Sequence, residues 1–157
     1  MTTVAHILSA SLISLFVAKV APHETALVII AVISAAALDL DHIYYMVRDK
    51  AYFAKHGYKH NLHRARSPLH ELVGFSIFSM VALVLSFFDS KLAIVVALPA
   101  MIHIVEDVLM GIAMPFNPID KTRTKLIPQR GYVKVVVDIA IITIFGCLWV
   151  QYLSAAN

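Results

Sequence analysis

The stretch that decides the fold is the apolar run ALVIIAVISAAAL at residues 26–38, followed directly by the charged stretch DLDH at residues 39–42. A charge placed in hydrocarbon costs roughly 2.5–3.5 kcal/mol even on the lenient insertion scales. Two carboxylates at the end of such a run therefore need a compensating positive charge. No Lys or Arg occurs between Lys19 and Arg48, so that charge comes from another part of the chain or from a metal ion.

The whole chain is strongly apolar. Of its 157 residues, 60% are hydrophobic, and the mean hydropathy is +0.79, which lies outside the range of soluble globular domains. The composition therefore indicates a membrane protein. No linker, low-complexity tract or repeat divides the sequence, so we expect one membrane-embedded helical domain over residues 1–157. The first apolar segment has no basic region ahead of it, and we expect a retained span there.

Hydrophobic runs predict an all-α, polytopic bundle of about five transmembrane helices. Each predicted helix reaches or approaches the ~20 residues that cross a bilayer. The third has a defined start, because Ser67 is a typical N-cap and Pro68 suits the first helical position. Pro99 is expected to kink the fourth helix. The predicted helices cover residues 3–20, 24–47, 68–88, 91–110 and 132–153.

The basic residues predict how the bundle is oriented. Eleven of the 13 Lys and Arg residues lie in or beside the second-to-third and fourth-to-fifth connections. In a five-span chain both connections fall on the same side as the N-terminus. The positive-inside rule makes that side cytoplasmic and places the C-terminus outside, in a cell (inner) membrane. The net charge of +3 fits contact with anionic membrane lipids better than nucleic-acid binding.

With this topology the intramembrane histidines and acidic residues converge near the cytoplasmic side. His103 and Asp107 are spaced i,i+4, and Asp39 and His42 are spaced i,i+3, so each pair shares a helix face. Helical bundles build metal sites from such short motifs on separate helices. The predicted metal ligands are His6, Asp39, Asp41, His42, His63, His70, His103 and Asp107.

This ligand set predicts divalent metal ions as cofactors. Eight side chains exceed the four that a single zinc ion usually takes, so two or more ions are expected. Mixed imidazole and carboxylate ligands suit Zn²⁺, Mn²⁺ or Fe²⁺, and the sequence does not choose among them.

Each feature also has a simpler explanation. His23 and His56 fit solvated loop residues better than ligands, and Glu106 fits a salt bridge with a loop arginine better than a metal ligand. Arg64 and Arg66 could neutralise the carboxylates in a purely structural network. That network leaves the gathering of so many histidines unexplained. The roles of His60 and Glu71, and the continuity of the second helix at residues 39–41, stay open.

The order of these motifs resembles that of the YdjM-like family of membrane-bound metal-dependent hydrolases. The resemblance covers roughly residues 1–118 and rests on His6, the 39–42 element, the HRARSPLH stretch at residues 63–70, and His103-x-x-x-Asp107. The common form of the third motif is His-Arg-Gly-x-Thr-His-Ser. Here the glycine is missing and the second histidine comes two residues later. The family resembles the helical zinc-dependent phospholipase C enzymes, which implies hydrolysis of phosphoesters.

The resulting hypothesis is an enzyme that hydrolyses a phosphoester with metal-activated water. An unligated carboxylate among Asp39, Asp41 and Glu71 would act as general base, and Arg64, with Arg66 as a second candidate, would bind the phosphate. The site would lie within about 10 Å of the cytoplasmic boundary. A phospholipid or other lipid-linked phosphoester therefore fits as substrate better than a soluble metabolite. The oligomeric state is left open.

Two other classes of function remain alternatives. A metal or proton transporter needs polar groups through the depth of the membrane. No charge and no histidine occurs in stretches of the outer halves of the predicted helices such as residues 12–18, 26–33, 78–88 and 144–150. A metal-stabilised structural or sensory membrane protein would bind the same ions without catalysis. Ion flux that Asp107→Asn abolishes would favour the transporter.

Overall fold

The computed structural model describes residues 2–57, 67–120, 122–126 and 131–155. These residues form helices and one isolated antiparallel bridge between Ala113 and Thr124, with no strand among them. The predicted all-α class is therefore confirmed. In chain order the elements are α1 (Thr3–Val17), α2 (Thr25–Ala37), α3 (Asp39–Arg48), α4 (Lys50–His56), the 3₁₀-helix η2 (Pro68–His70), α5 (Leu72–Ser86), α6 (Ser90–Met110) and α7 (Gly131–Ser154).

Three helical segments are long and apolar enough to cross a membrane: Thr25–Arg48, Ser90–Met110 and Tyr132–Ser154. The first and third apolar segments were predicted to be of similar length, but α1 and α5 have only 15 residues each. Their rise is about 22 Å, which is less than the roughly 30 Å of a bilayer core. The bundle therefore combines three full-length spans with two shorter apolar helices.

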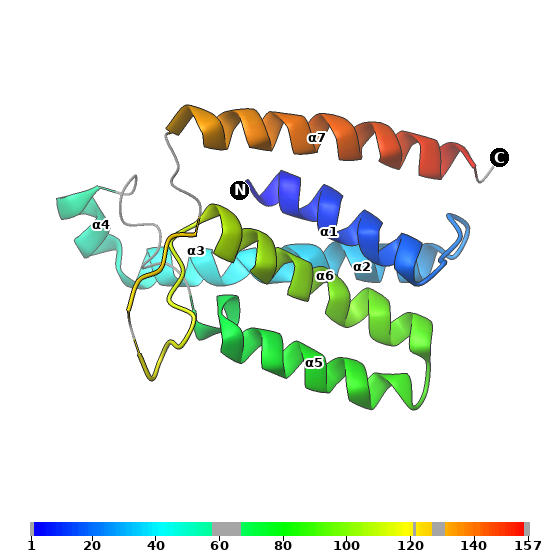
Figure 1. The fold of residues 1–157 in the computed structure, drawn as a ribbon, viewed down its shortest axis with the longest axis horizontal. Helices are drawn as coiled ribbons and strands as arrows, with labels where there is room; N and C mark the ends of the chain where they lie inside the picture. The colour runs from blue at the N-terminus through cyan, green and yellow to red at the C-terminus, as the bar shows by residue number, and fades with distance from the viewer. Residues whose placement is uncertain (1, 58–66, 121, 127–130, 156–157) are drawn as a thin grey trace.

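Helix α6 lies at the centre of the bundle, in contact with α1, α2 and α5, while α7 packs along α1 (Figure 1). One apolar cluster, which includes Leu12 and Leu15 of α1 and Val95 of α6, fills the end of the bundle near the α1–α2 turn. A second cluster contains Leu38 and Ile104 and lies toward the opposite end. The second cluster brings the chain around residue 38 against the last turns of α6.

The predicted second helix is interrupted for one residue. Helix α2 ends at Ala37 and α3 begins at Asp39, while Leu38 between them keeps right-handed helical angles (φ −64°, ψ −35°). The two helices consequently continue in nearly the same direction (Figure 1). The carboxylates of the 39–42 stretch therefore enter the structure at the start of α3 without a reversal of the chain.

The predicted third helix does not start at Pro68. Ser67 does act as an N-cap, since its side chain accepts a hydrogen bond from the Leu69 N–H at 3.1 Å, but it caps the short η2. Glu71 is extended, and α5 begins after it. A Cβ at Gly74 would lie 1.8 Å from the Leu69 carbonyl oxygen. Glycine at this position allows η2 to fold back against α5, and this fold fixes the position of His70.

Candidate metal centre

Helix α1 begins and α6 ends at the same end of the bundle, close to α3 (Figure 1). Side chains from four elements meet there. Helix α1 contributes His6 and η2 contributes His70, whereas α3 and α6 each contribute a histidine with a carboxylate one turn away. Two groups of potential ligand atoms result, and within each group these atoms all lie within 4.8 Å of one another. The groups are His6, His103 and Asp107, and Asp39, His42 and His70.

The first group is fully enclosed by the bundle. Its three side chains are buried, and the rings of His6 and His103 stack with centroids 4.0 Å apart. The Asp107 carboxylate faces both rings, with Oδ1 3.4 Å from His6 Nε2 and Oδ2 3.9 Å from His103 Nε2. The i,i+4 spacing of His103 and Asp107 produces this shared face.

The second group lies closer to the surface. His70 is buried, while Asp39 and His42 are partly buried. The rings of His42 and His70 stack with centroids 4.6 Å apart. His42 Nε2 lies 3.8 Å from Asp39 Oδ1, as their i,i+3 spacing predicts.

Two carboxylates connect the groups. Asp39 Oδ1 is 3.4 Å from His103 Nε2 of the first group, and Asp107 Oδ2 is 3.9 Å from His70 Nε2 of the second. Each carboxylate therefore faces histidines of both groups. Carboxylates placed in this way are typical of sites in which two ions lie close together.

All four histidines have the same orientation, with Nε2 toward the cluster and Nδ1 toward an outer oxygen. His103 Nδ1 is 2.9 Å from the Ala35 carbonyl oxygen. A carbonyl only accepts, so Nδ1 carries the proton, and in the neutral ring Nε2 presents a lone pair to the cluster. His6 has the same arrangement, because its Nδ1 lies 2.7 Å from Glu106 Oε2.

Asp41 lies on the outer side of the other two rings. Its Oδ1 is 2.9 Å from His42 Nδ1, and its Oδ2 is 3.2 Å from His70 Nδ1. The backbone N–H of Ser67 also donates to Oδ2 at 3.2 Å. Asp41 was predicted as a ligand; it belongs to neither group of candidate ligand atoms, and its hydrogen bond orients the imidazole of His42, while its contact with His70 Nδ1 is an ion-pair distance without hydrogen-bond geometry.

The chemistry of the inner atoms fits a cation. Asp39 Oδ2, His70 Nε2 and His103 Nε2 are buried and have no hydrogen-bond partner among the described residues. Leaving one such atom unsatisfied costs about 1–3 kcal/mol. Histidines that bind metals characteristically give their other ring N–H to a carboxylate or a backbone carbonyl. The cluster has both features, so its residues fit divalent metal ions.

Glu71, another predicted site residue, also lies outside both ligand groups. Glu71 is buried, and its Oε1 accepts a hydrogen bond from the Met114 N–H at 3.0 Å, so this carboxylate attaches the loop after α6 to the start of α5. The remaining predictions for this region concern residues outside those that the structure describes: His60, His63, Arg64 and Arg66.

The sequence did not predict the contacts that Glu106 makes with α1. Its Oε2 faces His6 and its Oε1 accepts a hydrogen bond from the Ser9 hydroxyl at 2.6 Å. The sequence predicts a loop arginine as its partner, whereas the described contacts of its carboxylate are with α1. A usable signal was present, because His6 and Ser9 are spaced i,i+3 and form one polar stripe on the apolar α1.

The sequence was compared with models of known protein families. A model of the YdjM inner membrane protein family matches residues 1–156. The chain belongs to the YdjM inner membrane protein family. No curated protein and no solved structure matches this YdjM chain. Membership agrees with the long apolar helices and supports a location in the inner membrane, in contact with its lipids.

Proposed function

We propose that this YdjM protein is an integral-membrane, metal-dependent hydrolase that acts on a phosphoester of a lipid. The observation that carries the proposal is the pair of contiguous ligand groups, in which four Nε2 atoms and two shared carboxylates face one another. The expected cofactors are two divalent ions, with Zn²⁺, Mn²⁺ and Fe²⁺ all compatible with the ligands. The predicted kinship with zinc-dependent phospholipase C enzymes belongs to the same proposal.

The residues divide into binding and orienting roles. When bound, a pair of divalent ions lowers the pKa of water toward neutrality and stabilises charge on a phosphoryl group. The histidines supply neutral ligands, and the shared carboxylates of Asp39 and Asp107 supply negative charge. Asp41 and Glu106 keep the histidine protons on the outer nitrogens. Preorganised ligands of this kind need no rearrangement during the reaction.

A proton acceptor is available within the cluster. Asp39 directs Oδ1 toward His42 and His103, while its buried Oδ2 has no hydrogen-bond partner in the described part of the chain. Oδ2 can therefore accept a proton from an attacking water. Glu71 was a second candidate for this role, but its contact with Met114 favours a function in positioning the loop.

Position in the membrane supports a lipid substrate. The cluster lies in the last two turns of α6 and, in the segment Thr25–Arg48, directly after Ala37, where the uninterrupted apolar run gives way to charged residues. That level of a bilayer is where phosphate head groups meet acyl chains. The predicted cytoplasmic orientation of this end is part of the proposal.

The test is hydrolysis by the purified full chain in detergent. With Zn²⁺ or Mn²⁺ we expect release of product from a phospholipid or a generic phosphodiester, and we expect His103→Ala and Asp107→Asn to abolish it. Glu24→Gln, at the opposite end of the bundle, should retain activity. Lack of turnover with every metal, together with metal-free protein in elemental analysis, would overturn the proposal. Stoichiometric metal without turnover would instead favour a structural role.

A further inference from the structure

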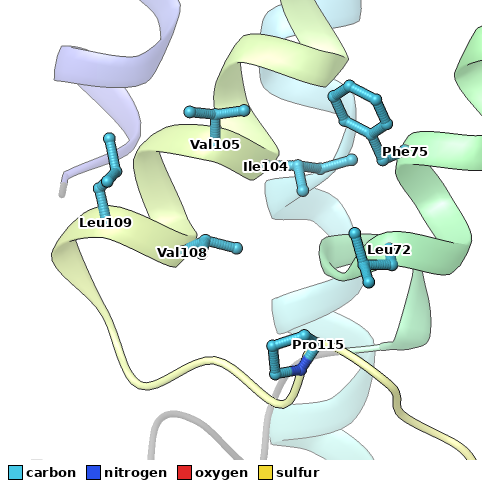
Figure 2. A pocket seen from close by; sticks show the side chains of 7 residues that line it. All are labelled: Leu72, Phe75, Ile104, Val105, Val108, Leu109 and Pro115. Carbon is cyan, nitrogen blue, oxygen red and sulfur yellow. The ribbon is translucent and has the colours of Figure 1, made fainter. Parts of the chain in front are cut away.

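A wholly apolar groove runs between α5 and α6 beside the candidate metal centre. Its volume is about 220 Å³. Leu72 and Phe75 of α5 form one wall, Ile104, Val105 and Val108 of α6 form the other, and Pro115 closes the end (Figure 2). Among the described residues no hydrogen-bonding side chain lines the groove, so its walls match a hydrocarbon chain better than a polar ligand.

The groove opens away from the bundle and continues into an apolar surface. Val105 is 44% exposed. In the loop that follows Pro115, Phe116 is 62% exposed and Ile119 is 94% exposed. Exposed apolar side chains that adjoin an apolar groove indicate a surface in contact with lipid in a protein of this family.

Basic residues lie beside the same loop. The backbones of Ala113 and Thr124 are joined by hydrogen bonds of 3.0 and 2.8 Å. This bridge brings the exposed Arg123 and Lys125 next to the segment that leads to Pro115. Exposed cations on a segment bridged to the chain that leads to the groove complement an anionic head group with an attached acyl chain.

The groove and the candidate metal centre share a level of the bundle. Ile104 and Val108 follow His103 and Asp107 directly in α6, so the two i,i+4 pairs lie on adjacent faces of one helix. The other wall begins at Leu72, directly after Glu71, and the Leu72 N–H donates to the Pro115 carbonyl oxygen at 3.3 Å. A lipid in the groove therefore has its head group near the depth of the cluster.

We propose that this groove binds one acyl chain of an anionic membrane phospholipid, with the head group at Arg123 and Lys125. Its further role as the tail subsite of the substrate rests on the proposed hydrolase function. The chain moves from one hydrocarbon environment to another, so its preference for the groove comes from van der Waals packing and from the head-group contacts rather than from removal of methylenes from water.

Binding can be tested without metal or turnover. Metal-free protein is placed in nanodiscs of phosphatidylcholine that contain a small fraction of phosphatidylglycerol with a photoactivatable group in one acyl chain. After irradiation, peptide mass spectrometry locates the label. We expect label on the groove residues, and a loss of about tenfold in Val105→Phe. The matched control is Val84→Phe, on the exposed face of α5 at 53% exposure, which should label as the wild type does.

The head-group contacts have their own readout. The double variant Arg123→Gln, Lys125→Gln should reduce labelling by phosphatidylglycerol several-fold and leave labelling by phosphatidylcholine unchanged. A label spread evenly over the exposed apolar side chains of α5 and α7, and insensitive to Val105→Phe, would overturn the proposal. Thermal unfolding of each variant checks that it is folded.

The outcome also separates this proposal from the proposed function. Groove labelling in a protein that hydrolyses nothing would support the lipid site and count against the hydrolase. If hydrolysis of lipid is as fast in Val105→Phe as in the wild type, the hydrolase survives and the tail subsite does not.

Discussion

Replacement of Glu106 tests the hydrogen bonds that orient His6. The carboxylate lies 2.7 Å from His6 Nδ1 and accepts from the Ser9 hydroxyl at 2.6 Å. Glu106→Gln keeps an acceptor for the imidazole N–H but removes the negative charge. Glu106→Ala removes the acceptor entirely, so the ring loses both its fixed proton position and its fixed orientation.

The size of each effect follows from these contacts. Charged hydrogen bonds are about twice as strong as neutral ones, so the glutamine variant should lose about 1 kcal/mol, or about fivefold in metal affinity. Loss of an outer partner of a metal-bound histidine costs about 10–100-fold. The larger value applies to Glu106→Ala, because His6 is buried at 1% exposure and water does not replace the missing acceptor readily.

Competition with a chromophoric chelator measures the affinity of the detergent-purified protein for Zn²⁺ or Mn²⁺. The expected order is wild type, then Ser9→Ala within about twofold, then Glu106→Gln, then Glu106→Ala. Glu24→Gln is the matched control, since that carboxylate pairs with Lys91 at the other end of the bundle. If Glu106→Ala binds metal as tightly as the control while His6→Ala does not, Glu106 does not orient His6 and the reasoning fails.

Three other variants test separate parts of the structure. Asp39→Asn should lower the metal content from two equivalents to one or none, because Asp39 faces both ligand groups. An unchanged metal content in elemental analysis would refute the interpretation that Asp39 serves both groups. Gly74→Ala should lower the free energy of unfolding by about 3 kcal/mol or more, since its Cβ would overlap backbone, whereas Gly146→Ala meets nothing within 4 Å and should be neutral or slightly stabilising in the same thermal scan. The hydrogen bond from Lys91 holds the pKa of Glu24 below its ordinary value of 4.5. The stabilisation from this pair is therefore present above that value and lost as the pH falls through the lowered pKa, so Glu24→Gln should lower the melting temperature at neutral pH and not in strong acid.

Much of the candidate site could be predicted because its residues carry a strong local signal. Histidines and carboxylates are rare in apolar helices, and the spacing of His103 with Asp107 places them on one face whatever the tertiary structure. The Lys and Arg pattern placed the ends of several helices at one level. Together these features identified the members of both ligand groups.

The roles within the site depend on tertiary contacts that the sequence does not contain. Asp39 and Asp41 are two residues apart on one helix and equivalent in the sequence, yet one faces the histidine Nε2 atoms and the other faces Nδ1 atoms. Two side chains that are two residues apart on a helix point about 200° away from each other. The spacing therefore predicts that Asp39 and Asp41 face different directions, but it does not predict which of them faces the cluster. The packing of Leu38 against α6 decides this.

The predicted start of the third helix at Pro68 was wrong for a related reason. Ser67 and Pro68 are a sound local start signal, and a helical turn does begin there. The turn ends after three residues because the chain folds back on Gly74, a contact between residues that no capping rule considers. The departure matters for function, since it directs His70 toward Asp41 and Asp107.

The inner atoms of the cluster carry an energetic cost that distinguishes a metal site from a structural network. Asp39 Oδ2, His70 Nε2 and His103 Nε2 are unsatisfied among the described residues, and at about 1–3 kcal/mol each they cost about 3–9 kcal/mol, against a typical total stability of about 5–15 kcal/mol. Cations bound by these atoms would remove that cost, so metal affinity and stability would be coupled. Asp39→Leu should then stabilise the metal-free protein while it weakens metal binding. In a network held by salt bridges the same variant would leave a buried cation unpaired and lower stability, so the sign of the change in melting temperature of the metal-free protein decides between the two.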